Sequence, residues 1–143
     1  RMKQHCENAE KVVNFLKKHK EVTKVIYSTE HEKKIADRAK QYLKGGNGPM
    51  VGIELKGGIE AGKKFIESLK MFYHVANIGD ARSLAIHPAS TTHSQLNEKE
   101  LAASGVTQSY VRLCIGIEHI DDIIDDLDQA LNKSSKGSLK AVS

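Results

Sequence analysis

The sequence predicts a single small α/β domain, in which a mixed or mostly antiparallel sheet of about four strands carries helices on one face. Two observations support this prediction. Segments in which apolar residues recur every three or four positions alternate along the chain with short segments rich in β-branched residues. The length of 143 residues is that of one ordinary domain, which buries roughly 70% of the surface that its unfolded chain exposes.

The first part of the chain predicts a helix, a strand and a second helix. Apolar residues at helical spacing predict an amphipathic helix over residues 1–19; they are Met2, Cys6, Ala9, Val12, Val13 and Leu16. The β-branched segment Val22–Tyr27 predicts a strand. Ile35, Ala39, Tyr42 and Leu43 then predict a helix, which the glycine-rich segment Gly45–Pro49 ends.

The middle of the chain predicts two more strands and two more helices. Val51, Ile53 and Leu55 alternate as in a half-buried strand, and Gly57 and Gly58 turn the chain into the next helix. The segment Arg82–Pro88 predicts another strand, which ends at the proline because proline cannot donate to a sheet. Asn97, followed three residues later by Glu100, is typical of a helix start, and Gly105 closes that helix.

The last part predicts a strand, a helix and a tail. Along Tyr110–Glu118, alternate apolar residues share one face; they are Val111, Leu113, Ile115 and Ile117. Arg112, Cys114 and Gly116 take the other face, which we expect to be free of helices. The final helix has aspartates in its first turn, where the helix dipole favours them. Residues 132–143 are polar and patternless, which predicts a flexible tail.

Composition excludes several classes of protein. Apolar residues make up 39% and charged residues 28%, as in a globular chain. No apolar run approaches the roughly 20 residues that span a bilayer, and the first residues do not form a signal peptide. The net charge of +4 is scattered and mixed with acidic residues, so we expect no nucleic-acid partner. Two distant cysteines, Cys6 and Cys114, predict buried thiols in a cytoplasmic protein.

The segment Ile86–Leu96, IHPASTTHSQL, has the residue types of a functional site. His87 and His93 are six residues apart across a proline, which is not a metal-ligand spacing, so we expect no metal site. Its hydroxyls lack the strained turn of a serine hydrolase, and we expect them to bond backbone groups instead. The segment Lys56–Lys64 lacks the spacing of a phosphate-binding loop.

Arg112 stands in an otherwise apolar strand and must find an anion, because an unpaired buried guanidinium is costly. One interpretation is a structural ion pair with one of the aspartates. The other is capture of a ligand carboxylate through the planar two-pronged guanidinium. Composition and periodicity leave both open.

Two longer segments together resemble a known family. They are VANIGDARSLAIHPASTTHSQL and VRLCIGIEHIDDIIDDLDQAL, and HCENAEKVVNFLKKH and ELKGGIEAGKKFIESLKMF extend the likeness over nearly the whole chain. They resemble the C-terminal domain of the Cys/Met-metabolism enzymes that depend on pyridoxal phosphate (PLP). Within that family, NIGDARSLAIHPASTTHSQL is most similar to the O-acetylhomoserine sulfhydrylase branch.

The resemblance implies a domain organisation. Residues 1–131 would be the small C-terminal domain of a fold-type I PLP enzyme, beginning with the helix that links it to the large domain. The large domain would hold PLP and the Schiff-base lysine and would lie outside this chain. The resemblance thus implies no catalytic and no cofactor-binding residue here, and a chain that is inactive alone.

The resemblance also assigns three substrate-binding residues. Arg112 matches the arginine that binds the substrate α-carboxylate. Asn77 stands where many relatives have a serine next to that carboxylate, and Thr92 matches a threonine that lines the substrate side of the cleft. His87 and His93 match family positions as well, and we expect them to shape the loop rather than transfer protons.

The function implied is PLP-dependent replacement of the acetate of O-acetylhomoserine by sulfide, giving homocysteine. The implied partners are the amino-acid substrate, sulfide, the chain's own PLP domain and further copies in a homotetramer. Within the family, a cystathionine γ-synthase or a cystathionine or methionine γ-lyase is the alternative. From another class, the alternatives are a free-standing amino-acid-binding module and a purely structural domain.

Overall fold

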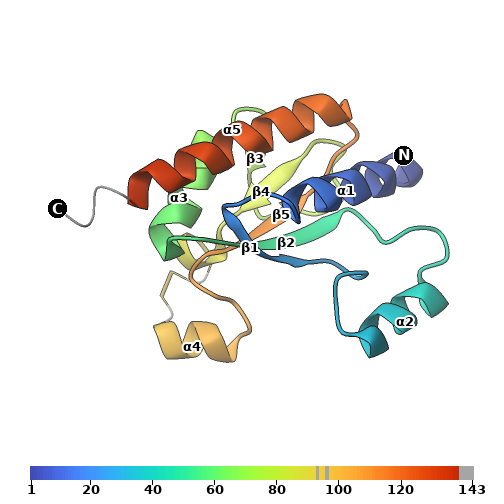
Figure 1. The fold of residues 1–143 in the computed structure, drawn as a ribbon, viewed down its shortest axis with the longest axis horizontal. Helices are drawn as coiled ribbons and strands as arrows, with labels where there is room; N and C mark the ends of the chain where they lie inside the picture. Colours follow the sequence, from blue (N-terminus) through green and yellow to red (C-terminus); the bar gives the residue numbers. More distant parts are fainter. Residues whose placement is uncertain (93, 96, 139–143) are drawn as a thin grey trace.

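The computed structural model describes residues 1–92, 94–95 and 97–138, and its elements follow the predicted alternation of helices and strands (Figure 1). In chain order they are α1 (Met2–Leu16), β1 (Val22–Ile26), α2 (Lys33–Tyr42), β2 (Met50–Leu55), α3 (Gly58–Ser68), β3 (Tyr73–His74), β4 (Leu84–Ile86), the 3₁₀ helix η1 (Pro88–Ser90), α4 (Glu98–Ala103), β5 (Tyr110–Cys114) and α5 (Ile120–Ser138).

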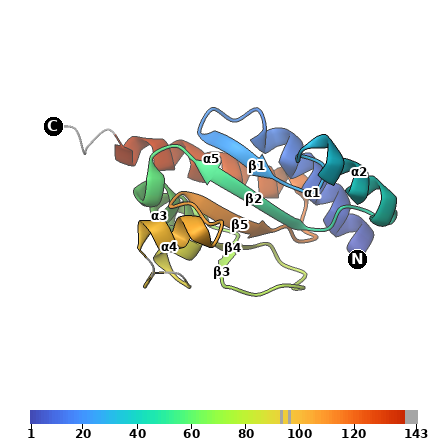
Figure 2. The ribbon, with the colours of Figure 1, turned by 90° about the horizontal axis from the view of Figure 1, so that it is seen from below.

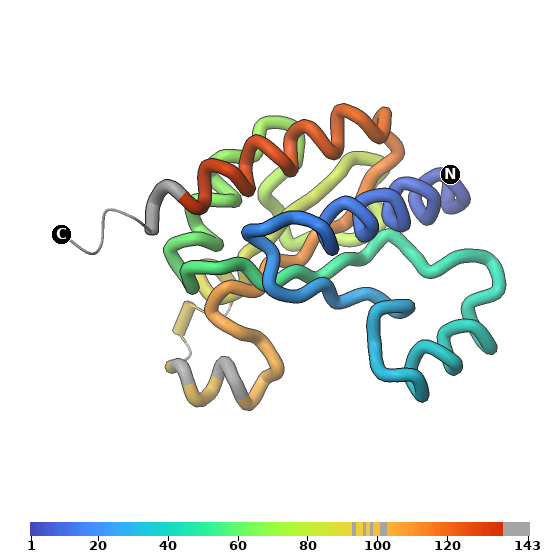
Figure 3. The backbone as a smooth tube through the Cα atoms, viewed as in Figure 1, coloured from blue at the N-terminus to red at the C-terminus, as the bar shows by residue number. Residues whose placement is uncertain are grey.

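The strands form one sheet in the order β1-β2-β5-β4-β3 (Figure 2). All neighbouring pairs are antiparallel except β3 and β4, which are parallel. β2 and β5 are far apart in sequence yet run side by side through the middle of the sheet (Figure 3). The predicted α/β class is confirmed, with five strands rather than about four. The additional strand, β3, has two residues and is too short to leave an alternating pattern.

The core lies between the sheet and a layer formed by α1, α3 and α5. On β5, Val111 and Leu113 are completely buried against these helices, and Ile115 just beyond the strand is also buried. α3 packs along α5. The turn after α3 is fixed by Asp126 of α5, whose carboxylate accepts hydrogen bonds from the backbone N–H groups of Lys70, Met71 and Phe72. A buried carboxylate with three such donors stabilises this join.

The other face of the sheet carries no continuous helix layer. Figure 1 places α1 and α5 on one side of the sheet, and α2 and α4 on the other side, towards its two ends. The prediction of helices on one face therefore holds for α1, α3 and α5 only. The apolar stripe expected on α2 leaves Ile35, Tyr42 and Leu43 exposed, and Ala39 is the residue of α2 that is buried. Periodicity identified this helix but could not say what its apolar side contacts.

The start of α4 agrees with the prediction from sequence, whereas the end of α5 differs from it. Asn97 and Glu100 form the expected cap of α4: the side-chain oxygen of Asn97 accepts from the N–H groups of Lys99 and Glu100, and Glu100 accepts from the N–H of Asn97. α5 continues to Ser138, so residues 132–138 of the expected tail are helical. Ser134 is buried and its hydroxyl donates to the carbonyl of Leu131, which lets a polar sequence continue the helix. Residues 139–143 lie outside the described residues.

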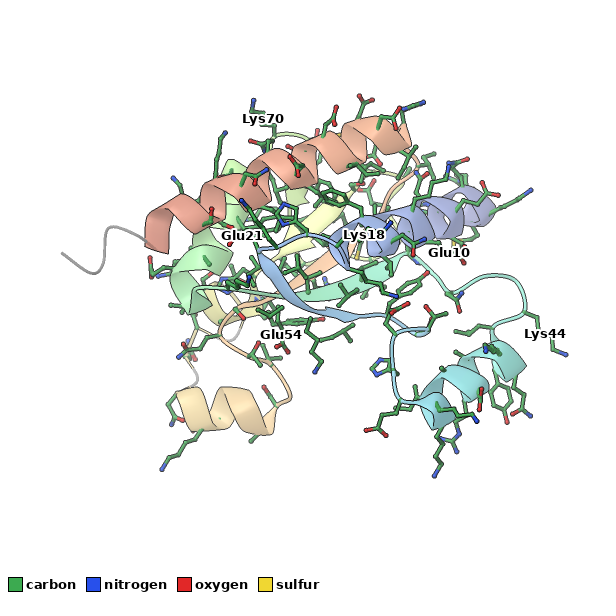
Figure 4. All side chains as sticks on the ribbon, in the orientation of Figure 1. Glu10, Lys18, Glu21, Lys44, Glu54 and Lys70 are labelled. Carbon is green, nitrogen blue, oxygen red and sulfur yellow. The ribbon has the colours of Figure 1, made fainter. Side chains whose placement is uncertain are left out.

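Charge is distributed over many elements. The labelled side chains in Figure 4, namely Glu10, Lys18, Glu21, Lys44, Glu54 and Lys70, come from different parts of the chain and are of both signs. Among the residues that the structure describes, no helix is long and apolar enough to cross a membrane. Over the same residues, no three His, Cys, Asp or Glu side chains gather as a metal site requires.

Candidate functional site

Arg112 lies on the face of the sheet opposite to the core. Its neighbours across the sheet are Gly52 of β2 and Ile86 of β4. Residues directly opposite each other in a sheet share a face, and the next residues along β5 point the other way, into the core. The predicted orientation of Arg112 is therefore confirmed. We call this side, with Tyr110, Arg112 and Cys114 of β5 at its centre, the open face.

A glycine shapes the open face beside Arg112. The ring of Tyr110 lies across Gly52, so that a Cβ atom on Gly52 would be 2.7 Å from the ring. A hollow of about 230 Å³ lies beside Arg112, towards the edge strand β1. It is lined by Ile26, Tyr27, Ser28, His31, Met50, Val51, Gly52, Tyr110 and Arg112. Burial raises the pKa of Tyr110, so its phenol is neutral at ordinary pH.

The guanidinium of Arg112 has few partners within the chain. Its Nε is buried and makes no hydrogen bond, and its Nη2 donates to the backbone carbonyl of Asn77 at 3.4 Å. None of the described carboxylates forms an ion pair with it. The interpretation of Arg112 as half of an internal ion pair with an aspartate is therefore wrong for the described residues. A half-buried cation with unused donors is suited to bind an anion from outside.

Asn77 contacts Arg112 through its backbone. Its carbonyl oxygen accepts from Arg112 and lies 3.7 Å from the Sγ of Cys114. Its side-chain oxygen accepts from the N–H of Ile78 at 2.9 Å, within the same exposed loop. The loop of residues 75–82 thus covers one side of Arg112, and the hollow over Gly52 lies on the other.

His87 fixes the loop that follows β4. The side chain is fully buried, with Nε2 2.7 Å from the carbonyl of Gln108 and Nδ1 2.8 Å from the hydroxyl of Ser90. Burial lowers the pKa of His87, which favours a neutral ring that donates from Nε2 and accepts at Nδ1. The hydroxyl of Thr91 donates to the carbonyl of His87 at 2.9 Å, whereas the hydroxyl of Ser90 donates its one proton to Nδ1. The prediction that these hydroxyls bond backbone groups therefore holds for Thr91.

Thr92 follows in an exposed turn just beyond η1. The structure places it just beyond the segment that His87 holds. His93, the other histidine of this motif, lies outside the described residues. Arg112 and Asn77 are in direct contact.

Sequence reasoning missed Gly52 and Tyr110. A glycine in the interior of a strand signals a close approach of another group, and this signal could have identified position 52. Nothing in the sequence indicates that the approaching group is Tyr110, because the two residues meet only through the pairing of β2 with β5.

A family model for the Cys/Met metabolism PLP-dependent enzymes matches residues 1–132. The chain belongs to this family. Its members depend on PLP, and the resemblance of the sequence to them is thereby confirmed. The chain spans about a third of the length of the curated relatives it matches, 30–33% for those compared below.

The family relatives include several activities. An O-acetyl-L-homoserine sulfhydrylase of Leptospira meyeri is 51% identical over 132 residues, which are 92% of this chain and 30% of that protein. An L-methionine γ-lyase of Fusobacterium nucleatum subsp. polymorphum is 44% identical over 133 residues, 93% of this chain and 33% of that protein.

Solved structures of relatives share the fold. A protein of Campylobacter jejuni described as an O-acetylhomoserine (thiol)-lyase, crystallised with N'-pyridoxyl-lysine-5'-monophosphate, gives a TM-score of 0.83 at 41% identity and covers 92% of this chain and 31% of its own. A cystathionine γ-synthase of Xanthomonas oryzae pv. oryzae in complex with cystathionine gives 0.82 at 31% identity, with 95% and 35% covered.

Proposed function

We propose that this chain is the substrate-carboxylate-binding domain of an O-acetylhomoserine sulfhydrylase, which replaces the acetate of O-acetylhomoserine by sulfide to give homocysteine. The observation behind the proposal is the guanidinium of Arg112, half-buried on the open face with a buried Nε that has no partner. The 51% identity with a sulfhydrylase supports the choice of reaction. A free-standing amino-acid-binding module would use the same arginine but would not need family membership.

The donor chemistry of the hollow fits the substrate better than the cofactor. It offers one guanidinium among walls that are mostly apolar or hydroxyl-bearing, which matches one carboxylate rather than a doubly charged phosphate. We therefore assign PLP to a large domain joined to this chain, with the chain itself supplying no cofactor ligand. When bound there, PLP supplies the electron sink that the reaction requires.

The residues of this chain act by orientation. Arg112 binds the carboxylate through two parallel N–H···O bonds, which fixes the direction in which the rest of the amino acid points. The carbonyl of Asn77 holds Nη2 from one side and so restricts rotation of the guanidinium. The neutral Tyr110 beside it excludes water without competing for the anion. A charge-assisted bond of this kind contributes roughly 1.5–3 kcal/mol, or about ten- to a hundredfold in affinity.

The test is steady-state kinetics of the full-length enzyme with O-acetylhomoserine and sulfide. We expect wild type to make homocysteine, and Arg112→Ala to lower kcat/KM tenfold or more while remaining folded. Lys24→Ala is the matched control, because Lys24 of β1 is also a cation on the open face. It already has a partner, Glu54 of β2. Lys24→Ala should leave kcat/KM unchanged. Equal losses in the two variants would indicate a general charge effect and would contradict the proposal.

The choice of reaction has its own test. The likeness to a methionine γ-lyase and to a cystathionine γ-synthase supports the alternative that the enzyme has one of these two activities. Cysteine in place of sulfide would then give cystathionine, and methionine alone would give methanethiol. If the rate with cysteine or with methionine exceeded the rate with sulfide, the enzyme would be assigned to the γ-synthases or the γ-lyases. The role of Arg112 would be unchanged.

The proposal includes a cytoplasmic location and an oligomeric enzyme. Cys6 and Cys114 are both free and buried, as in a protein of a reducing compartment. It also includes inactivity of the 143-residue chain alone. We expect PLP added to this chain to give no absorption band that survives gel filtration.

A further inference from the structure

Ser83 joins the strand β4 to the turn that precedes α5. It is completely buried just before β4. Its N–H donates to one carboxylate oxygen of Glu118 at 2.6 Å and its hydroxyl donates to the other at 2.9 Å. The same hydroxyl oxygen accepts from the N–H of Gly116 at 2.9 Å. Each polar group of Ser83 in this network is thus engaged with the turn at 116–118.

The turn at 116–118 is itself held from the helix layer. Asn8 of α1, also completely buried, donates to the carbonyls of Gly116 and Glu118 at 3.1 and 2.9 Å. Gly116 permits this close packing, because a Cβ there would lie 2.5 Å from the backbone N of Ser83 and 2.6 Å from the carbonyl of Ala81. The carboxylate of Glu118 is therefore presented to Ser83 from a fixed position.

This network ends at the loop that carries Asn77. The N–H of Ile117 donates to the carbonyl of Ala81 at 2.9 Å, and the N–H of Tyr73 donates to the carbonyl of Ser83 at 3.0 Å. The exposed loop of residues 75–82 is thus fastened at both of its ends, near Tyr73 and at Ala81 to Ser83. Between these anchors, the carbonyl of Asn77 lies against Arg112.

We propose that Ser83 and Glu118 are positioning residues for the carboxylate site: they fix the loop whose Asn77 carbonyl orients the guanidinium of Arg112. This inference rests on the proposed function. Both oxygens of the Glu118 carboxylate are engaged by Ser83, at the end of that loop. Asp126 is a comparable carboxylate, since it also accepts backbone N–H groups but holds the turn after α3 instead.

The experiment compares an acid with its amide in the full-length enzyme. Norvaline and norvalinamide, which lack a leaving group, serve as competitive inhibitors that differ only at the carboxylate. We expect wild type to prefer the acid at least tenfold, and Arg112→Ala to lose this preference. In Ser83→Ala the preference should fall threefold or more, with KM for O-acetylhomoserine raised more than kcat is lowered. Glu118→Gln, which retains one acceptor oxygen, should lose less.

The control is Asp126→Asn, which should lower Tm but leave the preference for the acid unchanged. A folded Ser83→Ala enzyme with the wild-type preference would overturn the inference. If Ser83→Ala fails to fold, Glu118→Gln is the deciding variant. A wild-type preference for the acid in Glu118→Gln would overturn the inference, and a reduced preference would support it. No preference in wild type would instead contradict the carboxylate role of Arg112 itself, and the inference would fail with it.

Discussion

The two faces of the sheet are built from alternate residues of the same strands, yet they differ in what determines them. On β5 and just beyond it, Val111, Leu113 and Ile115 are buried against helices. On the open face, Tyr110 and Arg112 are half-buried and line a hollow. Arg112 also contacts the loop of residues 75–82. On the covered face we expect an apolar side chain of suitable volume to suffice, whereas on the open face we expect the chemistry of Arg112 and its immediate neighbours to matter. Stability and substrate binding should therefore separate along a single strand.

Adjacent residues of β5 provide the largest contrast. Leu113→Ala should reduce the free energy of unfolding by about 2–5 kcal/mol, because it leaves a cavity beneath the helices. Arg112→Ala should change it by less than about 1 kcal/mol, since the guanidinium has no ion pair among the described residues. Urea unfolding of the 143-residue chain measures both. A loss at Arg112 as large as that at Leu113 would show that the open face also stabilises the fold.

Two glycines test the same contrast with an added methyl group. Gly62→Ala, on the covered side, places its Cβ against the enclosed imidazole of His87 and should destabilise by about 1–3 kcal/mol. Gly52→Ala pushes on the ring of Tyr110, which is half-buried and can swing outward. We expect Gly52→Ala to cost less in unfolding free energy and to raise KM for O-acetylhomoserine. A larger loss of stability in Gly52→Ala, together with a raised KM in Gly62→Ala, would contradict the assignment of the two faces.

The smallest effect concerns pH. Burial lowers the pKa of His87 below the ordinary value of about 6.5, so the unfolded chain binds the proton more readily than the folded one. The contribution of His87 to stability is therefore complete above about pH 6.5 and is lost as the pH falls below it. Unfolding curves between pH 8 and pH 5.5 should show this slope in wild type, and a smaller one in His87→Gln. Equal slopes would mean that His87 is protonated alike in both states.

The covered face could be predicted from sequence because burial repeats with the period of each element. That periodicity located α1, β5 and α5, and it placed Arg112 opposite to the core. The open face could not be predicted in the same way. Contacts such as Tyr110 with Gly52, and Ser83 with Glu118, join segments that only the folded sheet brings together. The contact between Arg112 and the backbone carbonyl of Asn77 could not be predicted either, because backbone groups leave no signal in the sequence.

Helix α2 has a consequence for the motions of the molecule. Ala39 is its buried residue, whereas its apolar Ile35 and Tyr42, and Leu43 just after it, are exposed. A helix of ten residues is marginal by itself, and its persistence depends on packing. In native-state hydrogen exchange, amides of α2 should therefore exchange by local opening, while those of α1 and α5 should wait for unfolding of the whole domain. The end of the open face next to α2 would then rearrange on its own, without disturbing the layer that supports Arg112.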